Sequence, residues 1–352
     1  MKVKQRFKQW IPVGILGATG SVGQKFVELL ADHPWFEITA LAASERSAGK
    51  RYREVVNWFQ TVQLPPVQAE MVVQECVPDL PCRIVFSGLD SSVAGEVEAE
   101  FAQAGYVVIS NSRNHRMDPD VPLLVPEINA DHLNLVKRQS FDGGMIVTNP
   151  NCSTIGMVMA LKPLLDAFGL EAVNVVTMQA LSGAGYAGVS EPVHMDNVIP
   201  FISGEEEKME TEPLKILGQL NGSTVEPACV AISAQCNRVP VSDGHLESVS
   251  VKLGREVAKE DIVQVWNKFV GDPQELRLPS APERPLQYFS EDMFPQPKLH
   301  RDLEGGMVVS VGRLRPCSLL DYKFSVLSHN TIRGAAGGAI LNAELMVEKG
   351  LI

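Results

Sequence analysis

Residues 11–23, IPVGILGATGSVG, have the pattern of a strand, a glycine turn and a helix, from which the fold class is predicted. Residues 11–16 form a compact apolar run typical of a buried strand, a glycine turn follows without a gap, and apolar residues then recur at helical spacing over residues 24–30. This order predicts a phosphate cradle, in which Gly17 permits a tight turn, Gly20 admits a pyrophosphate and Gly23 lets the helix pack closely. We expect a dinucleotide-binding unit here; a merely structural turn is the alternative.

Further apolar segments continue this alternation. We expect strands over residues 36–43, 84–88 and 106–110, with a helix over 91–104, which is typical of a Rossmann-type doubly wound parallel sheet. After residue 150, longer segments such as 172–180 and 247–254 alternate apolar and polar residues, which favours a mainly antiparallel or mixed sheet. The predicted fold class is therefore α/β, with a second α+β domain.

The length of 352 residues suits two domains. We expect residues 1–149 to bind the nucleotide and residues 150–329 to form the second domain. Residues 330–352 read as a helix rich in Gly and Ala, which gains stability only from close packing, so we expect it to return to the first domain. The proline-rich residues 273–297 predict an excursion that packs on a neighbour or subunit.

Composition excludes several classes of protein. A net charge of −11 argues against a nucleic-acid binder, because phosphate backbones require clustered Lys and Arg. No apolar run reaches the ~18 residues of a membrane span, and the basic N-terminus leads into a domain rather than a secretory signal. Six scattered cysteines show no C-x-x-C pair and no metal-ligand spacing with the seven histidines. We expect a cytoplasmic protein with free thiols, no metal, and no nucleic-acid or membrane partner.

Cys152 lies between a short apolar strand, residues 145–147, and a segment with helical periodicity. Free N–H groups and the helix dipole at such a position favour the thiolate, which is the nucleophilic form. His245, far along the chain, is a candidate general base and acid for such a cysteine. The alternatives are a small buried apolar residue for Cys152 and a turn residue beside Asp243 for His245.

Two polar segments predict anion binding. The second predicted strand is followed by Ser44, Arg46 and Ser47. At this position Arg and hydroxyl groups bind the 2′-phosphate of NADP, although Glu45 would equally suit NAD. The segment SNSRNHR, residues 110–116, follows another strand and carries two arginines able to hold phosphate or carboxylate. For that segment alone, a solvated loop is the default interpretation.

Several longer motifs together resemble the aspartate-β-semialdehyde dehydrogenase family, in particular its archaeal and fungal branch. They run nearly end to end: GATGSVGQ at 17–24, SGLDSSVAGEVE at 87–98, SNSRNHRM at 110–117, NPNCSTI at 149–155, LSGAGYAGVS at 181–190 and CNRVPVSDGHLE at 236–247. The resemblance implies that the second domain carries catalysis and dimerisation, in a homodimer or homotetramer.

The resemblance also implies roles for individual residues. Cys152 would be the nucleophile, His245 the general acid/base, and Gln179 the residue that orients the acylated cysteine. Arg238 and Glu205 would bind the substrate's carboxylate and amino groups, with Glu206 and Glu207 open as alternatives to Glu205; Arg116 and Lys208, beside Asn151, would bind phosphate. The implied NADP contacts are Gly17, Thr19, Gly20, Ser21, Val22, Ser44, Arg46, Ser47, Ser87, Ser182, Gly183 and Asn330.

The implied reaction is the reversible, NADP-dependent reductive dephosphorylation of L-4-aspartyl phosphate to L-aspartate 4-semialdehyde through a cysteine thioester, a step toward lysine, methionine and threonine. Aspartate semialdehyde and inorganic phosphate are then the small-molecule partners. Related acyl reductases, acting on N-acetylglutamyl phosphate or malonyl-coenzyme A, share the resemblance. A non-catalytic NADP-binding sensor, in which Cys152 is only packing, is the alternative from another class.

Overall fold

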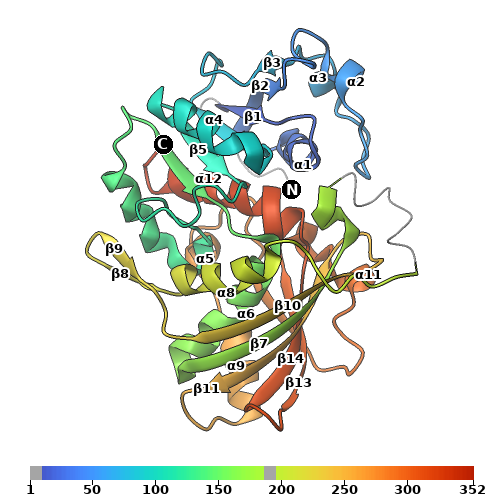
Figure 1. Ribbon diagram of the computed structural model, residues 1–352, viewed down its shortest axis with the longest axis vertical. Helices are drawn as coiled ribbons and strands as arrows, with labels where there is room; N and C mark the ends of the chain where they lie inside the picture. Colours follow the sequence, from blue (N-terminus) through green and yellow to red (C-terminus); the bar gives the residue numbers. More distant parts are fainter. Residues whose placement is uncertain (1–9, 186–195) are drawn as a thin grey trace.

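The computed structural model describes residues 10–185 and 196–352, and its strands form two six-stranded sheets and one hairpin (Figure 1). The first sheet contains β1 (Ile11–Leu16), β2 (Phe36–Ala43), β3 (Gln74–Glu75), β4 (Ile84–Ser87), β5 (Val107–Ser110) and β6 (Met145–Thr148). The second contains β7 (Leu170–Gln179), β10 (Ala231–Arg238), β11 (His245–Leu253), β12 (Leu286–Phe289), β13 (Val309–Pro316) and β14 (Tyr322–Ser328). The hairpin is β8 (Gln219–Asn221) with β9 (Thr224–Glu226).

The described helices follow the same chain order. The α-helices are α1 (Ser21–Leu30), α2 (Tyr52–Val55), α3 (Pro66–Ala69), α4 (Ser91–Gln103), α5 (Pro126–Asn129), α6 (Cys152–Phe168), α8 (Glu205–Ile216), α9 (Lys259–Lys268), α10 (Asp272–Glu275), α11 (Pro297–His300) and α12 (Gly337–Glu348). Shorter 3-10 segments are η1 (Ala130–Arg138), η2 (Leu181–Ala184) and η4 (Leu303–Gly306), and η5 (Ile332–Ala336) is a π-helix. Within the two described ranges, no helix has the length and apolarity that crossing a membrane requires.

The first sheet is parallel throughout and has the order β3-β2-β1-β4-β5-β6. Alternate strand residues point to opposite faces, so Ile15 and Phe86 pack with α1 and α12, while Leu16 and Val85 pack with Phe101 of α4. Helices therefore cover both faces, and the predicted doubly wound Rossmann-type sheet is confirmed. Ligands of such sheets bind where the strand order reverses, here between the carboxyl ends of β1 and β4.

The glycine turn after β1 has the backbone that the sequence predicts. Gly17 has a φ of +74°, in the left-handed region that favours glycine, and α1 begins at Ser21. A Cβ on Gly23 would lie 2.2 Å from the carbonyl oxygen of Gly17, so only glycine lets α1 pack this closely against the turn. The cradle is thus shaped for an incoming pyrophosphate at the start of α1.

The second sheet has the order β10-β7-β11-β14-β13-β12 and mixes parallel with antiparallel pairs, as predicted. One of its faces packs against α6 and α9, whose Met157, Leu161 and Trp266 share a core with Val175 and Val249. Within the predicted excursion over residues 273–297, β12 pairs with β13 as the edge strand of this sheet, so part of the stretch packs on a neighbouring strand. The prolines on either side of β12 obscure its strand pattern in the sequence, and its partner β13 lies outside residues 273–297.

The C-terminal helix α12 runs across the middle of the molecule, between the parallel sheet and the second sheet (Figure 1). Ala339, Ile340 and Leu341 belong to the same core cluster as Val13 and Phe86 of the parallel sheet. The two sheets lie on either side of residue 149 in the chain. The division into residues 1–149 with 330–352, and residues 150–329, stays a prediction.

Candidate active site

Cys152 is the first residue of α6, directly after the strand β6 and the turn of residues 149–151. Asn151 caps this helix, because its side-chain Oδ1 accepts the backbone N–H groups of Ser153 at 3.0 Å and Thr154 at 3.2 Å. Gly334 of η5 lies against the cysteine, and a Cβ there would approach the Cys152 Cβ to 2.8 Å. The strand-to-helix position predicted for Cys152 is therefore observed.

Four neighbouring strands of the second sheet end at one edge beside this cysteine. Arg238 is the last residue of β10 and pairs with Gln179, the last residue of β7. His245 is the first residue of β11 and pairs with Ser328, the last residue of β14. Since Leu246 pairs with Met178, His245 lies next to Gln179 across the sheet. Strand register thus brings together three predicted site residues that are far apart in the sequence.

The His245 ring reaches the cysteine, with 3.3 Å between Nε2 and Sγ. Its other nitrogen, Nδ1, accepts the backbone N–H of Ala180 at 3.0 Å. An acceptor at Nδ1 requires the proton of the neutral ring to be on Nε2, so in this structure the ring donates a hydrogen bond to sulfur. The Ala180 amide, a backbone group that no sequence pattern indicates, sets this tautomer.

The ionisation of the pair corrects one expectation. Burial, helped by the nearby charge of Arg238, lowers the pKa of His245 to about 3, so the ring is neutral at pH 7. Burial and the charge of Glu205 raise the pKa of Cys152 to about 12, against the opposing effects of Lys208 and Arg238. The expected thiolate is therefore wrong for this structure, because burial outweighs the effect of the helix start and Asn151 already takes two N–H groups there.

Among the three consecutive glutamates, the structure distinguishes Glu205. Its carboxylate accepts from Asn151 Nδ2 at 2.6 Å, Lys208 Nζ at 2.5 Å and Gln179 Nε2 at 3.3 Å. Burial works toward a higher pKa of Glu205, but the charge of Lys208 and the hydrogen bonds outweigh it, so the pKa is lowered and the group is ionised. Glu206 instead accepts the Cys236 backbone N–H, and Glu207 is exposed.

The two cations predicted to bind phosphate, Arg116 and Lys208, both line one cleft with Cys152. Arg116 is buried and pairs with Glu212 at 2.8 Å, a residue that the sequence analysis did not select. Glu212 lies seven residues after Glu205 and four after Lys208 on α8, so helical spacing is the signal that predicts a shared face.

The cleft, of about 290 Å³, also contains several of the predicted cofactor residues. They come from the glycine turn, the η2 loop and the chain before η5: Ser21, Val22, Ser182, Gly183 and Asn330. Ser44, Arg46 and Ser47 lie at the carboxyl end of β2, with Arg46 exposed. Ser87 points elsewhere, because its hydroxyl donates to the buried Glu98 at 2.6 Å. The glycine-rich loop continues into residues 186–195, which lie outside the described residues.

A Rossmann-type sheet joined to a cysteine–histidine pair, beside a cleft with two cations, is typical of a nucleotide-dependent oxidoreductase. Comparison with known proteins narrows this class. The profile of the "Semialdehyde dehydrogenase, NAD binding domain" family matches residues 12–136, and that of the "Semialdehyde dehydrogenase, dimerisation domain" matches residues 161–333.

Individual relatives cover nearly the whole chain. Aspartate-semialdehyde dehydrogenases of Archaeoglobus fulgidus and Schizosaccharomyces pombe are each 50% identical over 97% of this chain and 99% of their own length. The crystal structure of the Candida albicans enzyme with NADP is 45% identical, with a TM-score of 0.90 over 98% of this chain and 100% of its own. That of Vibrio cholerae aspartate semialdehyde dehydrogenase II complexed with ASA is 30% identical, with a TM-score of 0.76 over 97% and 99%. The chain belongs to the aspartate-semialdehyde dehydrogenase family, as the sequence motifs predict.

Proposed function

We propose that the chain is an NADP-dependent aspartate-semialdehyde dehydrogenase that interconverts L-4-aspartyl phosphate and L-aspartate 4-semialdehyde through a thioester on Cys152. The observation that carries the proposal is the 3.3 Å contact between the buried His245 and Cys152, together with the cleft that Cys152 lines with Arg116 and Lys208. Relatives of this name that share about half of the sequence support the substrate.

The cofactor assignment rests on the shape of the first sheet and on the Candida albicans relative, whose structure is with NADP. The turn at Gly17 and Gly23, which a Cβ would fill, fits a pyrophosphate, and Ser21 and Val22 line the cleft at the start of α1. Arg46 at the end of β2 would hold the 2′-phosphate. When bound, NADP accepts the hydride that the substrate carbon gives up.

The protein side chains then act in a defined order. The sulfur of Cys152 attacks the aldehyde carbon, while His245 would give its Nε2 proton to the oxygen that gains charge and take the thiol proton at Nε2 in its place. The hydroxyl proton so formed leaves when the carbon gives up its hydride. After oxidation the acyl group is a thioester on Cys152, which inorganic phosphate cleaves to the acyl phosphate. Gln179 would orient the acylated cysteine.

The charged groups of the site suit the two ends of such a substrate. A dianionic phosphate requires cations, which Arg116, Lys208 and the neighbouring Asn151 amide supply. Arg238, buried at the end of β10, would hold the planar carboxylate, and the ionised Glu205 would hold the ammonium group. These roles need both Glu205 and Lys208 free to exchange partners, since they pair with each other here.

The test is NADP reduction with aspartate semialdehyde, measured with and without inorganic phosphate. We expect turnover that depends on phosphate, and loss of turnover in Cys152→Ala with the fold and NADP binding intact. NADP reduction that needs coenzyme A in place of phosphate would indicate a malonyl-coenzyme A reductase. A preference for the N-acetylated glutamate analogue over aspartate semialdehyde would indicate an N-acetylglutamyl-phosphate reductase. Turnover of Cys152→Ala near the original rate would exclude the covalent mechanism.

The assembly is proposed as a homodimer or homotetramer, because the second matched family profile is that of a dimerisation domain. Light scattering of the purified protein would distinguish the two, and a monomer would contradict both.

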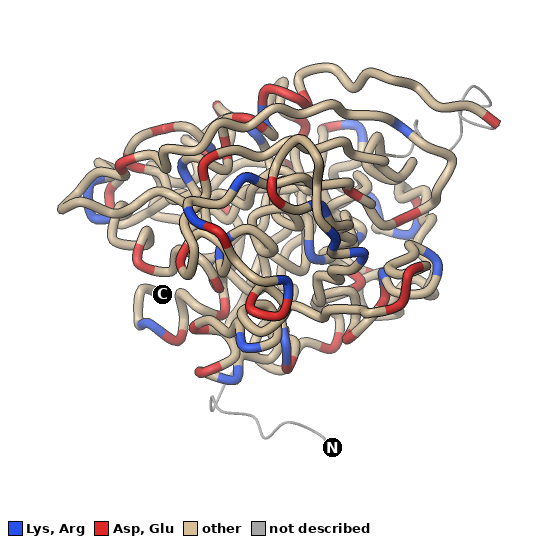
Figure 2. Tube along the Cα trace, turned by 90° about the horizontal axis from the view of Figure 1, so that it is seen from below, with Lys and Arg blue, Asp and Glu red and all other residues tan. Residues whose placement is uncertain are grey.

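We also propose a cytoplasmic location, consistent with six cysteines that are all free in the structure. Charges of both signs are interspersed along the chain (Figure 2), as expected for a protein that binds no nucleic acid.

A further inference from the structure

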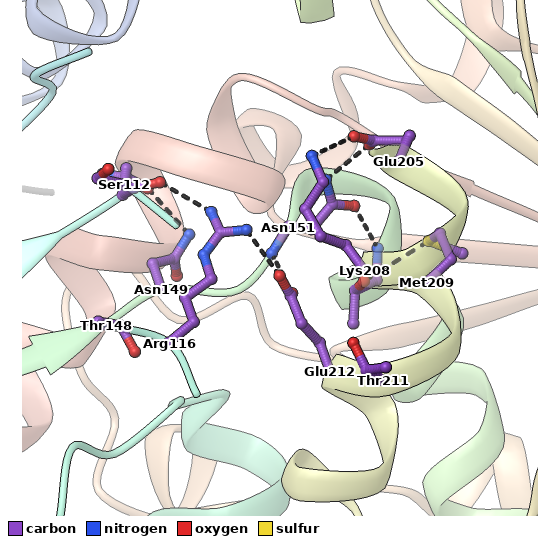
Figure 3. Close-up of polar contacts among 12 residues, drawn as sticks. Ser112, Arg116, Thr148, Asn149, Asn151, Glu205, Lys208, Met209, Thr211 and Glu212 are labelled. Atoms are coloured by element: carbon purple, nitrogen blue, oxygen red, sulfur yellow. Dashed lines mark hydrogen bonds and ion pairs between the residues drawn. The ribbon is translucent and has the colours of Figure 1, made fainter. Parts of the chain in front are cut away.

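Helix α8 carries four charged residues on one face, in the order Glu205, Lys208, Glu212 and Lys215. Their spacing of three, four and three residues places them along one side of the helix, and Figure 3 shows the first three directed at the turn before Cys152 and at Arg116. The proposed function uses Glu205 and Lys208. Glu212 and Lys215 have no role in it, although both are buried.

Glu212 joins two parts of the site through its two oxygens. Its Oε1 accepts from Nη1 of Arg116 at 2.8 Å, and its Oε2 accepts the backbone N–H of Asn151 at 2.7 Å (Figure 3). The side chain is 2% exposed, so both bonds form out of water, where charge-assisted hydrogen bonds are strong. One carboxylate thus fixes a cation and the residue next to the nucleophile relative to each other.

Arg116 keeps donors for a ligand despite these bonds. Its Nη2 donates to the Asn111 carbonyl at 2.8 Å, and within the described part of the chain its buried Nε has no partner. A guanidinium has five N–H groups, so the fork is oriented but not saturated. Lys215 holds the same loop by donating to the carbonyls of Arg116, Asp118 and Val121 at 2.7 to 2.8 Å.

We propose that Glu212 is a positioning residue that aims Arg116 at the phosphate and fixes Asn151 beside Cys152, while its negative charge weakens phosphate binding. The inference rests on the proposed function, because it assumes that Arg116 contacts the phosphate. Its two effects have opposite signs. Alignment raises the rate of the phosphate-dependent step, whereas a carboxylate paired with Arg116 offsets part of the attraction for a dianion.

The substitution Glu212→Gln separates the two effects. It removes the negative charge. The NH2 group of the glutamine is a donor, so it cannot accept from both Arg116 and the Asn151 N–H as the carboxylate does, and one of the two hydrogen bonds is lost. We expect the KM for inorganic phosphate to fall by about threefold to tenfold, the scale of one removed charge near a partly buried ion. We expect kcat to fall by about tenfold or more, because misaligned groups react slowly. Damage to the fold alone would instead raise KM as kcat fell.

Two variants serve as controls. Glu207→Gln removes an equal charge from an exposed position of α8, and we expect its KM and kcat to stay near those of the unaltered protein. Glu212→Asp restores the charge on a shorter side chain that cannot span both donors. We expect its KM for phosphate to return toward the original value while kcat stays low. This result would separate the effect of charge from that of alignment even if Glu212→Gln folds poorly.

Phosphate binding is also measured without turnover, from the concentration of inorganic phosphate that half-protects Cys152 against alkylation. We expect this concentration to be lower in Glu212→Gln than in the unaltered protein. The inference would be overturned if Glu212→Gln had a higher KM for phosphate and a higher half-protecting concentration than the unaltered protein. Kinetics of Glu212→Gln equal to those of Glu207→Gln would also overturn it. Failure of the proposed function is distinguishable, because the unaltered protein itself would then show no phosphate-dependent NADP reduction.

Discussion

At the scale of the residue, the ionisation of Cys152 has a measurable consequence in the ligand-free protein. Because burial and Glu205 raise its pKa to about 12, the thiolate fraction keeps rising with pH throughout the neutral and alkaline range. We expect the rate of alkylation of Cys152 by iodoacetamide to rise about tenfold per pH unit from pH 7 to 10 without levelling off. Mass spectrometry of the modified peptides, resolved by cysteine, measures this rate.

Cys317 is the internal reference for that experiment. Hydrogen bonds from the backbone of Leu320 and Leu319 lower its pKa, so its alkylation should level off at a lower pH than that of Cys152. A plateau for Cys152 below pH 8 would show that the Nε2–H of His245 and the helix dipole outweigh burial, and the original expectation of a thiolate would be restored.

Which residues form the site could be predicted in part from the sequence. Cys152 and the glycine turn follow from local patterns, because each depends on neighbours within a few residues. Glu212 could not be selected, since its partner Arg116 is 96 residues away and only the folded chain brings them together. The raised pKa of Cys152 is not predicted from the sequence for the same reason, because both its burial and its closeness to the charge of Glu205 arise only in the folded chain.

At the scale of the element, strands and helices with strong local patterns were predicted closely. The predicted bounds of β1 and β2 agree with the structure, and α6 begins at Cys152. β12 was missed because its four residues lie between prolines, and its pairing with β13 is a contact that periodicity does not report. The sequence likewise indicates a mixed sheet, but not the strand order that aligns Arg238, Gln179 and His245.

The start of α6 yields a prediction about Asn151, which combines a structural with a site role. Its Oδ1 caps the helix and its Nδ2 donates to Glu205. We expect Asn151→Ala to lower the free energy of unfolding by about 1 to 2 kcal/mol through loss of the cap. Asn151→Ser keeps a capping oxygen, so its stability should lie closer to that of the unaltered protein while kcat stays low in both. Urea unfolding and steady-state kinetics measure the two effects; equal destabilisation by Ala and Ser would contradict the capping role.

At the scale of the whole molecule, the segment from Asn330 to α12 connects the two sheets to the nucleophile. Asn330 bonds to the Gly244 N–H and to Ser182, beside the strand that starts with His245. Gly334 packs on Cys152, and α12 completes the core of the parallel sheet. A change in this segment should therefore affect stability and catalysis together.

Arg333 provides the test, because it lies within this segment and forms a buried ion pair with Glu127 of α5. Two bonds, of 2.7 and 2.5 Å, join side chains that are 1% and 0% exposed. We expect Arg333→Met to lower the free energy of unfolding by about 3 to 5 kcal/mol, since it leaves a carboxylate buried without its cation.

The double replacement Arg333→Met with Glu127→Leu removes both charges, so we expect it to be more stable than the single variant and to recover part of the kcat that the single variant loses. Urea unfolding of the single and double variants measures the coupling between the two residues. Strictly additive losses would show that the pair contributes no more than its separate packing, and that the segment is held against Cys152 by its apolar contacts alone.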